Sequence, residues 1–214
     1  MNSQIILASA SPRRKELLAQ IGYDFTVVVS DVDENIEKCE PGQFVAELSK
    51  RKALAVAENL DVVSNVDREI VPCGSIVSIN ELDSTVIIGA DTVVAIDGEI
   101  LGKPKDEEDA VRMLLMLGGK CHSVYTGVTI VKLGMLQGKS VEAVDTFFDE
   151  TRVYMYPITE QEARDYVASG EPMDKAGSYA IQGIAGKFVE KIEGSYNNVV
   201  GLPVEKIYQR LKRV

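Results

Sequence analysis

The sequence has no tryptophan, a single histidine and only three cysteines among its 214 residues. The cysteines, Cys39, Cys73 and Cys121, lie far apart and contain no Cys-x-x-Cys pair. They therefore lack the spacing of a structural zinc site and the even number of a disulfide framework, which fits a reducing compartment. The lone histidine, His122, falls within an expected strand, which favours a structural role over a catalytic one.

Long apolar runs and an excess of positive charge are also missing. No apolar stretch reaches the ~20 residues that a membrane-spanning helix needs, and no basic segment precedes the short apolar run near the N-terminus, so no signal peptide is expected. The 23 Lys and Arg against 33 Asp and Glu give a formal net charge of −10. Because an extended nucleic-acid surface needs a basic face, we expect neither nucleic acid nor a membrane as partner. A nucleotide needs only a few local cations, and we expect a cytoplasmic protein.

The pattern of apolar residues predicts a mixed fold of the α/β or α+β class, organised as a single domain over residues 1–214. Residues 61–84 break this pattern, and we expect a surface insertion there, with only a weak β-like patch at 75–79. Residues 89–92 are expected to interrupt the strand at 85–96. The expected strands cover residues 4–8, 25–30, 85–96, 121–133, 140–156, 179–182 and 188–192. Helices are expected from Pro12 to Gly22, over 41–60 and 106–117, after a capping box at Thr159, and from Pro203.

A segment that follows the first strand, Ser9-Ala-Ser-Pro-Arg-Arg14, is the first candidate for chemistry. Ser11 is expected to cap the helix that Pro12 begins. Arginine is unfavourable in the first turn of a helix, so Arg13 and Arg14 suggest that an anion lies there. The hydroxyl groups of Ser9 and Ser11, the free backbone N–H groups and two guanidinium groups suit phosphate oxygens. The alternative, a solvated turn whose arginines pair with nearby carboxylates, is equally compatible with this spacing.

Two groups of carboxylates form the next candidates. Asp91 lies within an apolar run, where a carboxylate must be paired, hydrogen-bonded or bound to metal. This placement favours a metal ligand or a general base over an Asp that caps a β-turn or bulge. Asp31, Asp33 and Glu34 follow a predicted strand and could hold a hard cation such as Mg²⁺. By themselves these three residues fit a solvated acidic loop better.

Two lysines complete the set. Lys103 lies in a short turn, Leu-Gly-Lys-Pro, and Lys52 lies on the second helix, where a polar face is the simpler interpretation. The Gly-rich segment at 182–187 has neither the Walker A nor the dinucleotide-binding spacing. Two arginines, lysines, several carboxylates and no nucleophile suit metal-assisted attack of water on a phosphate ester or anhydride. The residues alone thus indicate a protein that acts on a nucleotide or a similar phosphate compound.

Seven ordered segments make the chain resemble the Maf family of nucleoside triphosphate pyrophosphatases from Ile5 to about Leu211. Each segment alone is a weak signal, but their number and order are highly specific. The main departure is the stretch at 61–84, which is often shorter in this family. The segments are LASASPRRKELL (7–18), VDE (32–34), KRKA (50–53), IIGADTVV (87–94), LGKP (101–104), GEPMDKAGSYAIQG (170–183) and GSYNNVVGLP (194–203).

The resemblance implies a two-lobed fold with a central mixed sheet flanked by helices, a cleft between the lobes and often a homodimer. It also implies hydrolysis of a nucleoside triphosphate to the monophosphate and pyrophosphate with Mg²⁺ or Mn²⁺. Asp91 would be the general base or would orient the attacking water, and Glu34 would hold the metal with Asp91 as a second ligand. The residues that would bind and neutralise the triphosphate are Ser9, Arg13, Arg14, Lys52 and Lys103.

A few positions bear on the subfamily. Arg14, Thr92 and Gln182 match the branch that resembles dTTP/UTP pyrophosphatases, and Gln182 could read a pyrimidine edge because its amide both donates and accepts hydrogen bonds. Such an enzyme could remove modified nucleotides before they enter nucleic acid. Proteins of this family are also associated with arrest of cell division and septum formation. The alternative function is therefore a nucleotide-binding regulator with little turnover.

Overall fold

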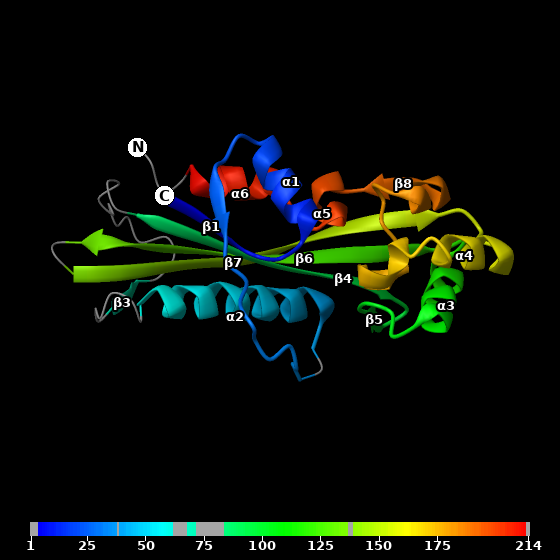
Figure 1. Ribbon diagram of the computed structural model, residues 1–214, viewed down its shortest axis with the longest axis horizontal. Coiled ribbons are helices and arrows are strands. Elements are labelled where there is room, and N and C mark those ends of the chain that lie inside the picture. The colour runs from blue at the N-terminus through cyan, green and yellow to red at the C-terminus, as the bar shows by residue number, and fades with distance from the viewer. Residues whose placement is uncertain (1–3, 38, 62–67, 72–83, 137–138, 213–214) are drawn as a thin grey trace. The chain divides into compact units, whose positions relative to one another are not determined.

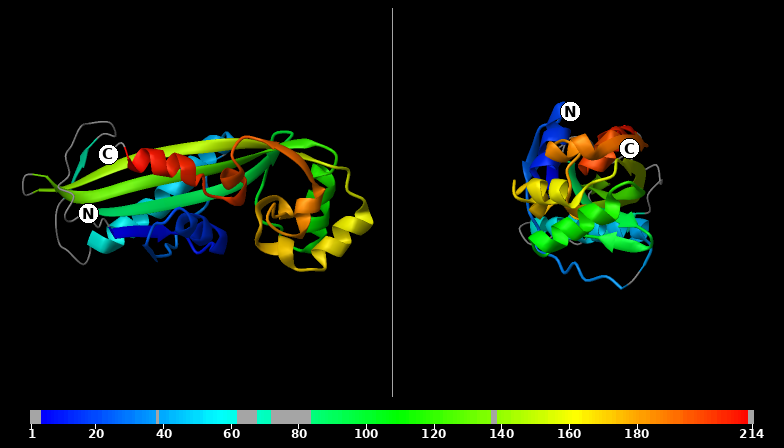
Figure 2. Two further views of the ribbon diagram at one scale, coloured as in Figure 1. Left: turned by 90° about the horizontal axis from the view of Figure 1, so that it is seen from above. Right: turned by 90° about the vertical axis from the view of Figure 1, so that its right-hand side faces the viewer.

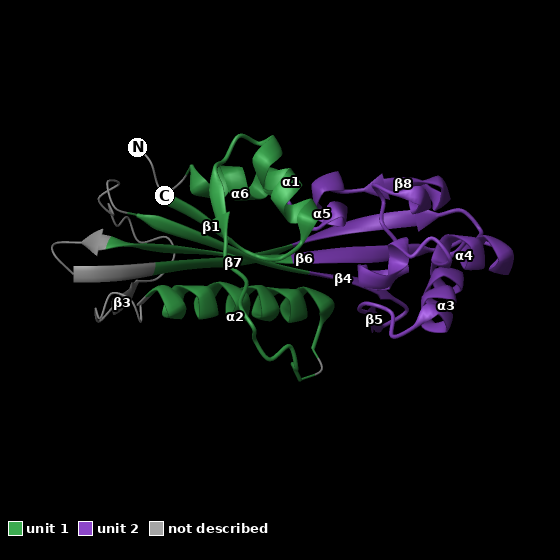
Figure 3. Ribbon diagram, in the orientation of Figure 1, with its two compact units in different colours: residues 1–91, 127–148, 204–214 green, residues 92–126, 149–203 purple. Residues whose placement is uncertain are grey.

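The computed structural model describes residues 4–37, 39–61, 68–71, 84–136 and 139–212 (Figure 1). The chain divides into two compact units (Figure 3). Unit 1 comprises Met1–Asp91, Gly127–Phe148 and Val204–Val214, and unit 2 comprises Thr92–Thr126 and Asp149–Pro203. The boundary falls inside three long strands, so each of these strands contributes residues to both units.

The strands form one mixed sheet, which confirms the expected fold class. Its order is β2-β1-β4-β6-β7-β3, with β5 paired to β4 and β8 paired to β7. Strand β1 runs parallel to β2 and β4, whereas β5 and β8 run antiparallel to their partners. The strands are β1 (Gln4–Ala8), β2 (Phe25–Val27), β3 (Arg68–Val71), β4 (Thr85–Ile96), β5 (Glu99–Leu101), β6 (Cys121–Leu136), β7 (Lys139–Met155) and β8 (Val189–Glu193).

Helices flank the strands in both units. In unit 1, α2 covers one face of the strands while α1 and α6 lie on the other (Figure 1). Seen from above, α6 lies on the β7 side of that face and α1 on the β1 side (Figure 2). Unit 2 also contains three short 3₁₀ turns, Glu171–Asp174, Ala176–Ser178 and Ile184–Phe188. The α-helices are α1 (Pro12–Gln20), α2 (Pro41–Asp61), α3 (Glu107–Leu117), α4 (Glu160–Val167), α5 (Tyr196–Val200) and α6 (Val204–Leu211).

Helix α2 packs closely on the strands of unit 1 because two glycines face it. A Cβ atom at Gly89 in β4 would lie 2.5 Å from the carbonyl oxygen of Ser49, and one at Gly127 in β6 would lie 2.1 Å from that of Val45. Around these contacts Ala53 and its neighbours on α2 pack against apolar side chains of β1, β4 and β6. The missing side chains therefore determine how near α2, and every residue on it, can come to β4.

Unit 2 has its own core, formed by α3, α4 and the adjoining strands. Helix α4 begins with the predicted capping box, in which Thr159 and Glu162 exchange hydrogen bonds. His122 is buried in this unit, with Nε2 2.8 Å from the hydroxyl oxygen of Tyr179. This burial agrees with the structural role expected for the histidine.

Three sequence expectations about secondary structure are wrong. The strand expected at 25–30 ends at Val27, and beyond it the Ser30 hydroxyl donates to the Lys52 carbonyl oxygen on α2. The strand expected at 179–182 is absent, because the Gly183 N–H donates to the Ala180 carbonyl and closes a turn. Strand β4 runs through residues 89–92 without interruption.

Several boundaries do follow the predictions. Helix α1 begins at Pro12 and α2 at Pro41, and the Asp97-Gly98 turn joins the antiparallel strands β4 and β5. Both turn residues have positive φ, 51° and 81°, as a two-residue hairpin of this kind requires. One detail at α1 differs: the Ser11 side chain makes no capping hydrogen bond, and its backbone N–H donates to Ser9 Oγ instead.

The expected insertion at 61–84 is described only in part. Residues 68–71 form β3, which pairs in parallel with β7. Residues 62–67 and 72–83, which include the β-like patch at 75–79, lie outside the described residues, so the surface insertion stays a prediction.

Cys39 and Cys121 are free thiols. In the described parts of the chain, no helix is long and apolar enough to cross a membrane.

Candidate active site

Lys52 stands at the centre of the predicted site in unit 1. Its ammonium nitrogen lies 2.7 Å from Asp91 Oδ1 and 2.8 Å from Glu34 Oε1. The Lys52 and Asp91 side chains are only 16% and 14% exposed, whereas that of Glu34 is 63% exposed. Three segments far apart in sequence, α2, β4 and the loop after β2, thus bring two carboxylates to one cation.

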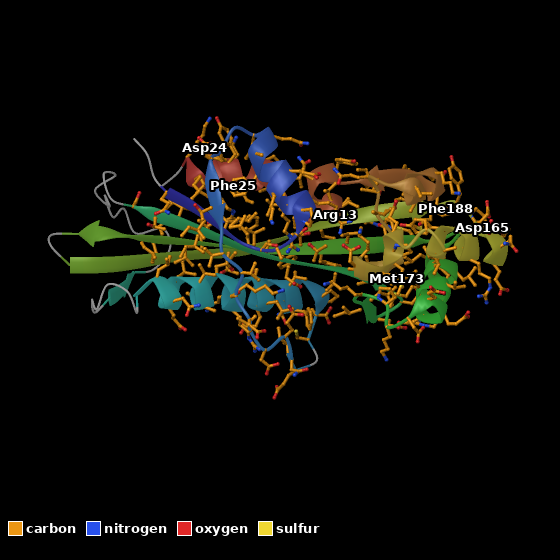
Figure 4. All side chains as sticks on the ribbon, viewed as in Figure 1. Arg13, Asp24, Phe25, Asp165, Met173 and Phe188 are labelled. Atoms are coloured by element: carbon orange, nitrogen blue, oxygen red, sulfur yellow. The ribbon has the colours of Figure 1, made fainter. Side chains whose placement is uncertain are left out.

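Arg14 joins the start of α1 to the same stretch of β4. Its Nη1 donates to Ser9 Oγ at 3.1 Å and to the carbonyl oxygen of Ala90, the residue before Asp91, at 2.9 Å. Burial lowers the pKa of Arg14, while the negative charge of Asp91 acts in the opposite direction and the positive charge of Arg13 adds to the lowering. Figure 4 places Arg13 at the start of α1. Ser9 is buried.

Thr92 follows Asp91 in β4, so its side chain lies on the opposite face of the strand. Its Oγ1 is 2.9 Å from Thr126 Oγ1, and the Thr126 hydroxyl donates to the carbonyl oxygen of Asn198 at 3.0 Å. Because a hydroxyl carries one hydrogen, Thr92 must be the donor to Thr126. The structure thus gives Thr92 a fixed place in a polar network of unit 2.

The predicted residues divide between the two units. Ser9, Arg14, Glu34, Lys52 and Asp91 come together in unit 1 through the contacts above, and Ser11 and Arg13 lie on the same segment as Ser9 and Arg14. Thr92, Lys103 and Gln182 belong to unit 2, where Lys103 and Gln182 are exposed. The functional roles of all these residues stay predictions.

The contacts exclude one alternative that the sequence left open and show how the acidic loop is held. Asp91 lies in a regular strand and pairs with Lys52, so it is not the cap of a turn or bulge. Asp33 and Glu34 lie in an irregular loop that is tied to α2, with Arg51 donating to the carbonyl oxygen of Asp33. Sequence reasoning missed this role of Arg51. Contacts to backbone carbonyl oxygens cannot be recognised from residue types in the sequence. The sequence indicates only that Arg51 can pair with Glu47, four residues earlier on the same helix.

The two carboxylates that meet at the Lys52 ammonium group have the ligand chemistry that a divalent metal would need. Mg²⁺ and Mn²⁺ prefer oxygen ligands, and Mg²⁺ is commonly held by one or two carboxylates together with substrate phosphates and water. Glu34 and Asp91 would supply those carboxylates. In the parts of the chain that the structure describes, no group of three or more His, Cys, Asp or Glu is placed to hold a metal.

Known proteins resemble this chain over nearly its whole length. Residues 4–214 match the family described as Maf-like protein. A dTTP/UTP pyrophosphatase from Agathobacter rectalis is 51% identical over 99% of this chain and 98% of its own length. Proteins of the same name from Lachnoclostridium phytofermentans and Thermoanaerobacter are 43% and 42% identical over 98% of this chain and 94% and 96% of their own lengths. The chain therefore belongs to the Maf family.

Proposed function

We propose that this protein hydrolyses nucleoside triphosphates, with dTTP and UTP as the preferred substrates, to the nucleoside monophosphate and pyrophosphate. The observation that carries the proposal is the contact of Lys52 with both Asp91 and Glu34, beside the Arg14 guanidinium. The names of the similar proteins support the substrate class. Modified pyrimidine nucleotides are proposed as further substrates, which a nucleotide house-cleaning enzyme would remove.

Asp91 is the group proposed to act on water. The Lys52 ammonium nitrogen lies 2.7 Å from Asp91 Oδ1 and so holds this carboxylate in one orientation. Asp91 Oδ2 can then accept a hydrogen bond from the attacking water. A positioned general base contributes about 10²–10⁴-fold to a rate. The proposed role of Asp91 is therefore to orient the water and accept its proton.

Cations that surround the triphosphate supply the second part of the mechanism. Negative charge grows on the leaving pyrophosphate in the transition state, and preorganised positive groups stabilise it. Arg13, Arg14, Lys52 and Lys103 are proposed for this role, with hydrogen bonds from Ser9 and Ser11. A divalent ion held by Glu34 and Asp91 would add charge neutralisation and fix the phosphate oxygens in place.

Substrate binding is proposed for Thr92, and base recognition for Gln182. Gln182 can both donate to and accept from a pyrimidine edge. The cytoplasmic location and the homodimer also remain part of the proposal, and light scattering of the purified protein would determine its oligomeric state.

Product analysis tests the function. Purified protein is incubated with each common and several modified nucleoside triphosphates, with Mg²⁺, Mn²⁺ or chelator, and the products are separated. We expect monophosphate and pyrophosphate from dTTP and UTP, lost with chelator. Release of orthophosphate would instead indicate a different phosphatase.

The Asp91→Asn variant separates an enzyme from a nucleotide-binding regulator. Asparagine keeps the size of the side chain but cannot accept the proton from water, so we expect turnover to fall by at least about 100-fold while nucleotide binding is largely kept. A wild-type protein that binds nucleotide without turning it over would contradict the proposed enzyme and favour the regulator.

A further inference from the structure

Glu34 lies on a loop that has little regular structure to hold it. Residues 28–37, between β2 and α2, contain neither helix nor strand, and the Glu34 side chain is 63% exposed. Ordering such a segment is opposed by the loss of backbone and side-chain freedom. A carboxylate that is already held in place binds a metal without this loss of freedom. The contacts that hold the loop therefore bear on metal binding by Glu34.

Arg51 on α2 holds the loop on both sides of Glu34. Its Nη1 donates to the carbonyl oxygen of Asp33 and to that of Asn35, both at 3.0 Å. Its Nε donates to Glu47 Oε1 at 2.9 Å, one turn earlier on the same helix. Three donors of one planar group are thus in use, and Glu47 sets the direction in which the guanidinium points.

Two further contacts tie the same loop to the next residue of α2. Lys52 Nζ contacts Glu34 Oε1, and the Ser30 hydroxyl donates to the Lys52 carbonyl oxygen at 3.2 Å. Within the loop, the Asn35 N–H donates to Asp33 Oδ1 at 2.9 Å and closes a local turn. The Glu34 side chain is therefore held by Lys52, while its backbone is held by Arg51.

We infer that Arg51 is a positioning residue that fixes Glu34 for binding of the divalent metal. Arg51 acts only through the loop backbone, whereas Lys52 and Asp91 form the site itself. The inference rests on the proposed function, because the metal is proposed there. Arginine suits this task better than lysine, since its fixed fork of donors serves three acceptors at once, while an ammonium group is a compact point charge on a flexible stem.

Three variants test this role. Arg51→Met removes the donors and the charge but keeps much of the apolar stem, and Arg51→Lys keeps the charge without the fork. Arg112→Met is the matched control, because Arg112 is also a helix-surface arginine paired with an acid on its own helix, Asp109, and with Glu99. It makes the same change in net charge in unit 2.

Hydrogen–deuterium exchange of the metal-free protein gives the first readout. We expect faster exchange of the backbone amides at 31–37 in Arg51→Met than in the wild type, with Arg51→Lys intermediate. The control should leave exchange of these amides unchanged. Unchanged exchange in Arg51→Met would overturn the inference, because the loop would then be held without Arg51.

The metal dependence of pyrophosphate release gives the second readout. At saturating nucleotide, Arg51→Met should need about tenfold more Mg²⁺ for half-maximal rate, as is typical when a group that orients a metal ligand is removed. The kcat at saturating Mg²⁺ should remain close to that of the wild type, a split that general loss of folded protein would not produce. Faster loop exchange without a change in metal dependence would overturn the role in metal binding.

Failure of the proposed function is distinguishable from failure of this inference. If the wild-type protein releases no pyrophosphate from any nucleotide, the proposed function fails. Binding of Mn²⁺ alone, followed by electron paramagnetic resonance, then replaces the rate measurement. Weaker Mn²⁺ binding by Arg51→Met than by Arg112→Met would support the role of Arg51, and equal binding would overturn it.

Discussion

At the scale of single residues, the ion pair of Lys52 with Asp91 bears on both the stability of the protein and the proposed catalysis. An exposed ion pair contributes only about 0–1 kcal/mol, but the Lys52 and Asp91 side chains are 16% and 14% exposed. Removal of one partner from a largely buried pair takes away the contact partner of the other charge, so the cost is larger than for an exposed pair. We therefore expect the lysine that is proposed for catalysis also to stabilise the fold.

Lys52→Met should lower the free energy of unfolding by about 3 kcal/mol, the lower end of the range for breaking a buried pair. Lys50→Met provides the control, since Lys50 is an exposed lysine on the same helix, and we expect it to change stability by less than about 0.5 kcal/mol. Urea unfolding followed by circular dichroism measures both variants. Equal free energies of unfolding of the two variants would show that the contact of Lys52 with Asp91 does not stabilise the protein.

His122 makes stability depend on pH. Burial lowers its pKa from 6.5 to about 4, so between these values the unfolded chain binds a proton that the folded protein does not. Stability contributed by neutral His122 is thus complete above pH 6.5 and is lost as the pH falls. This one group should account for a loss of about 2 kcal/mol between pH 7 and pH 5.

His122→Gln checks this prediction, because no other histidine is present. The slope of unfolding free energy against pH between 5 and 6.5, above the range in which most carboxylates titrate, should be smaller in the variant. An unchanged slope would contradict the assignment to His122.

At the scale of elements, the approach of α2 to the strands places Lys52 opposite Asp91. The approach depends on Gly89 and Gly127, where a Cβ atom would meet backbone atoms of α2 that cannot rotate away. A change in the distance between helix and strand would alter every contact that α2 makes with β4. Packing of these two elements and geometry of the site are therefore coupled.

Gly127→Ala should destabilise the protein by about 1–3 kcal/mol through overpacking, and it should lower the rate of pyrophosphate release because Lys52 moves with α2. Gly102→Ala is the stability control, since a Cβ atom there meets nothing within 4 Å. Thermal unfolding and a rate measurement test both effects. A Gly127→Ala protein as stable as Gly102→Ala would show that α2 can move without cost.

At the scale of the whole molecule, the chain passes repeatedly between two units. The boundary separates Asp91 from Thr92 within β4 and falls within β6 and β7 as well. All the residues proposed for catalysis and binding lie outside 62–83. That segment supplies only β3 to the described sheet, at the end of the strand order beyond β7.

Replacement of residues 62–83 by a short linker should therefore preserve turnover. Loss of β3 leaves the backbone groups of β7 without that neighbour, which favours association through the strand edge, so size-exclusion chromatography accompanies the rate measurement. A folded, monomeric variant without activity would show that the segment contributes to the site.

Local signals explain which parts could be predicted from the sequence. Pro12 and Pro41 set the starts of α1 and α2, the Thr159 capping box begins α4, and Asp97-Gly98 forms a hairpin, because each depends on residues within one turn. The strand expected at 179–182 is absent although Tyr179 and Ala180 are buried, because the chain turns at 180–183. Burial alone does not distinguish a strand from a turn.

The sequence by itself determined the class of fold, most of the element boundaries and, through its resemblance to a family, the set of residues proposed for the site. Only the tertiary structure decided that β4 continues through Asp91, that Lys52 contacts two carboxylates and that Arg51 holds the backbone around Glu34. The physical reason is that these contacts join residues 16–39 positions apart. Their partners include backbone oxygens, which every residue carries and no sequence pattern identifies.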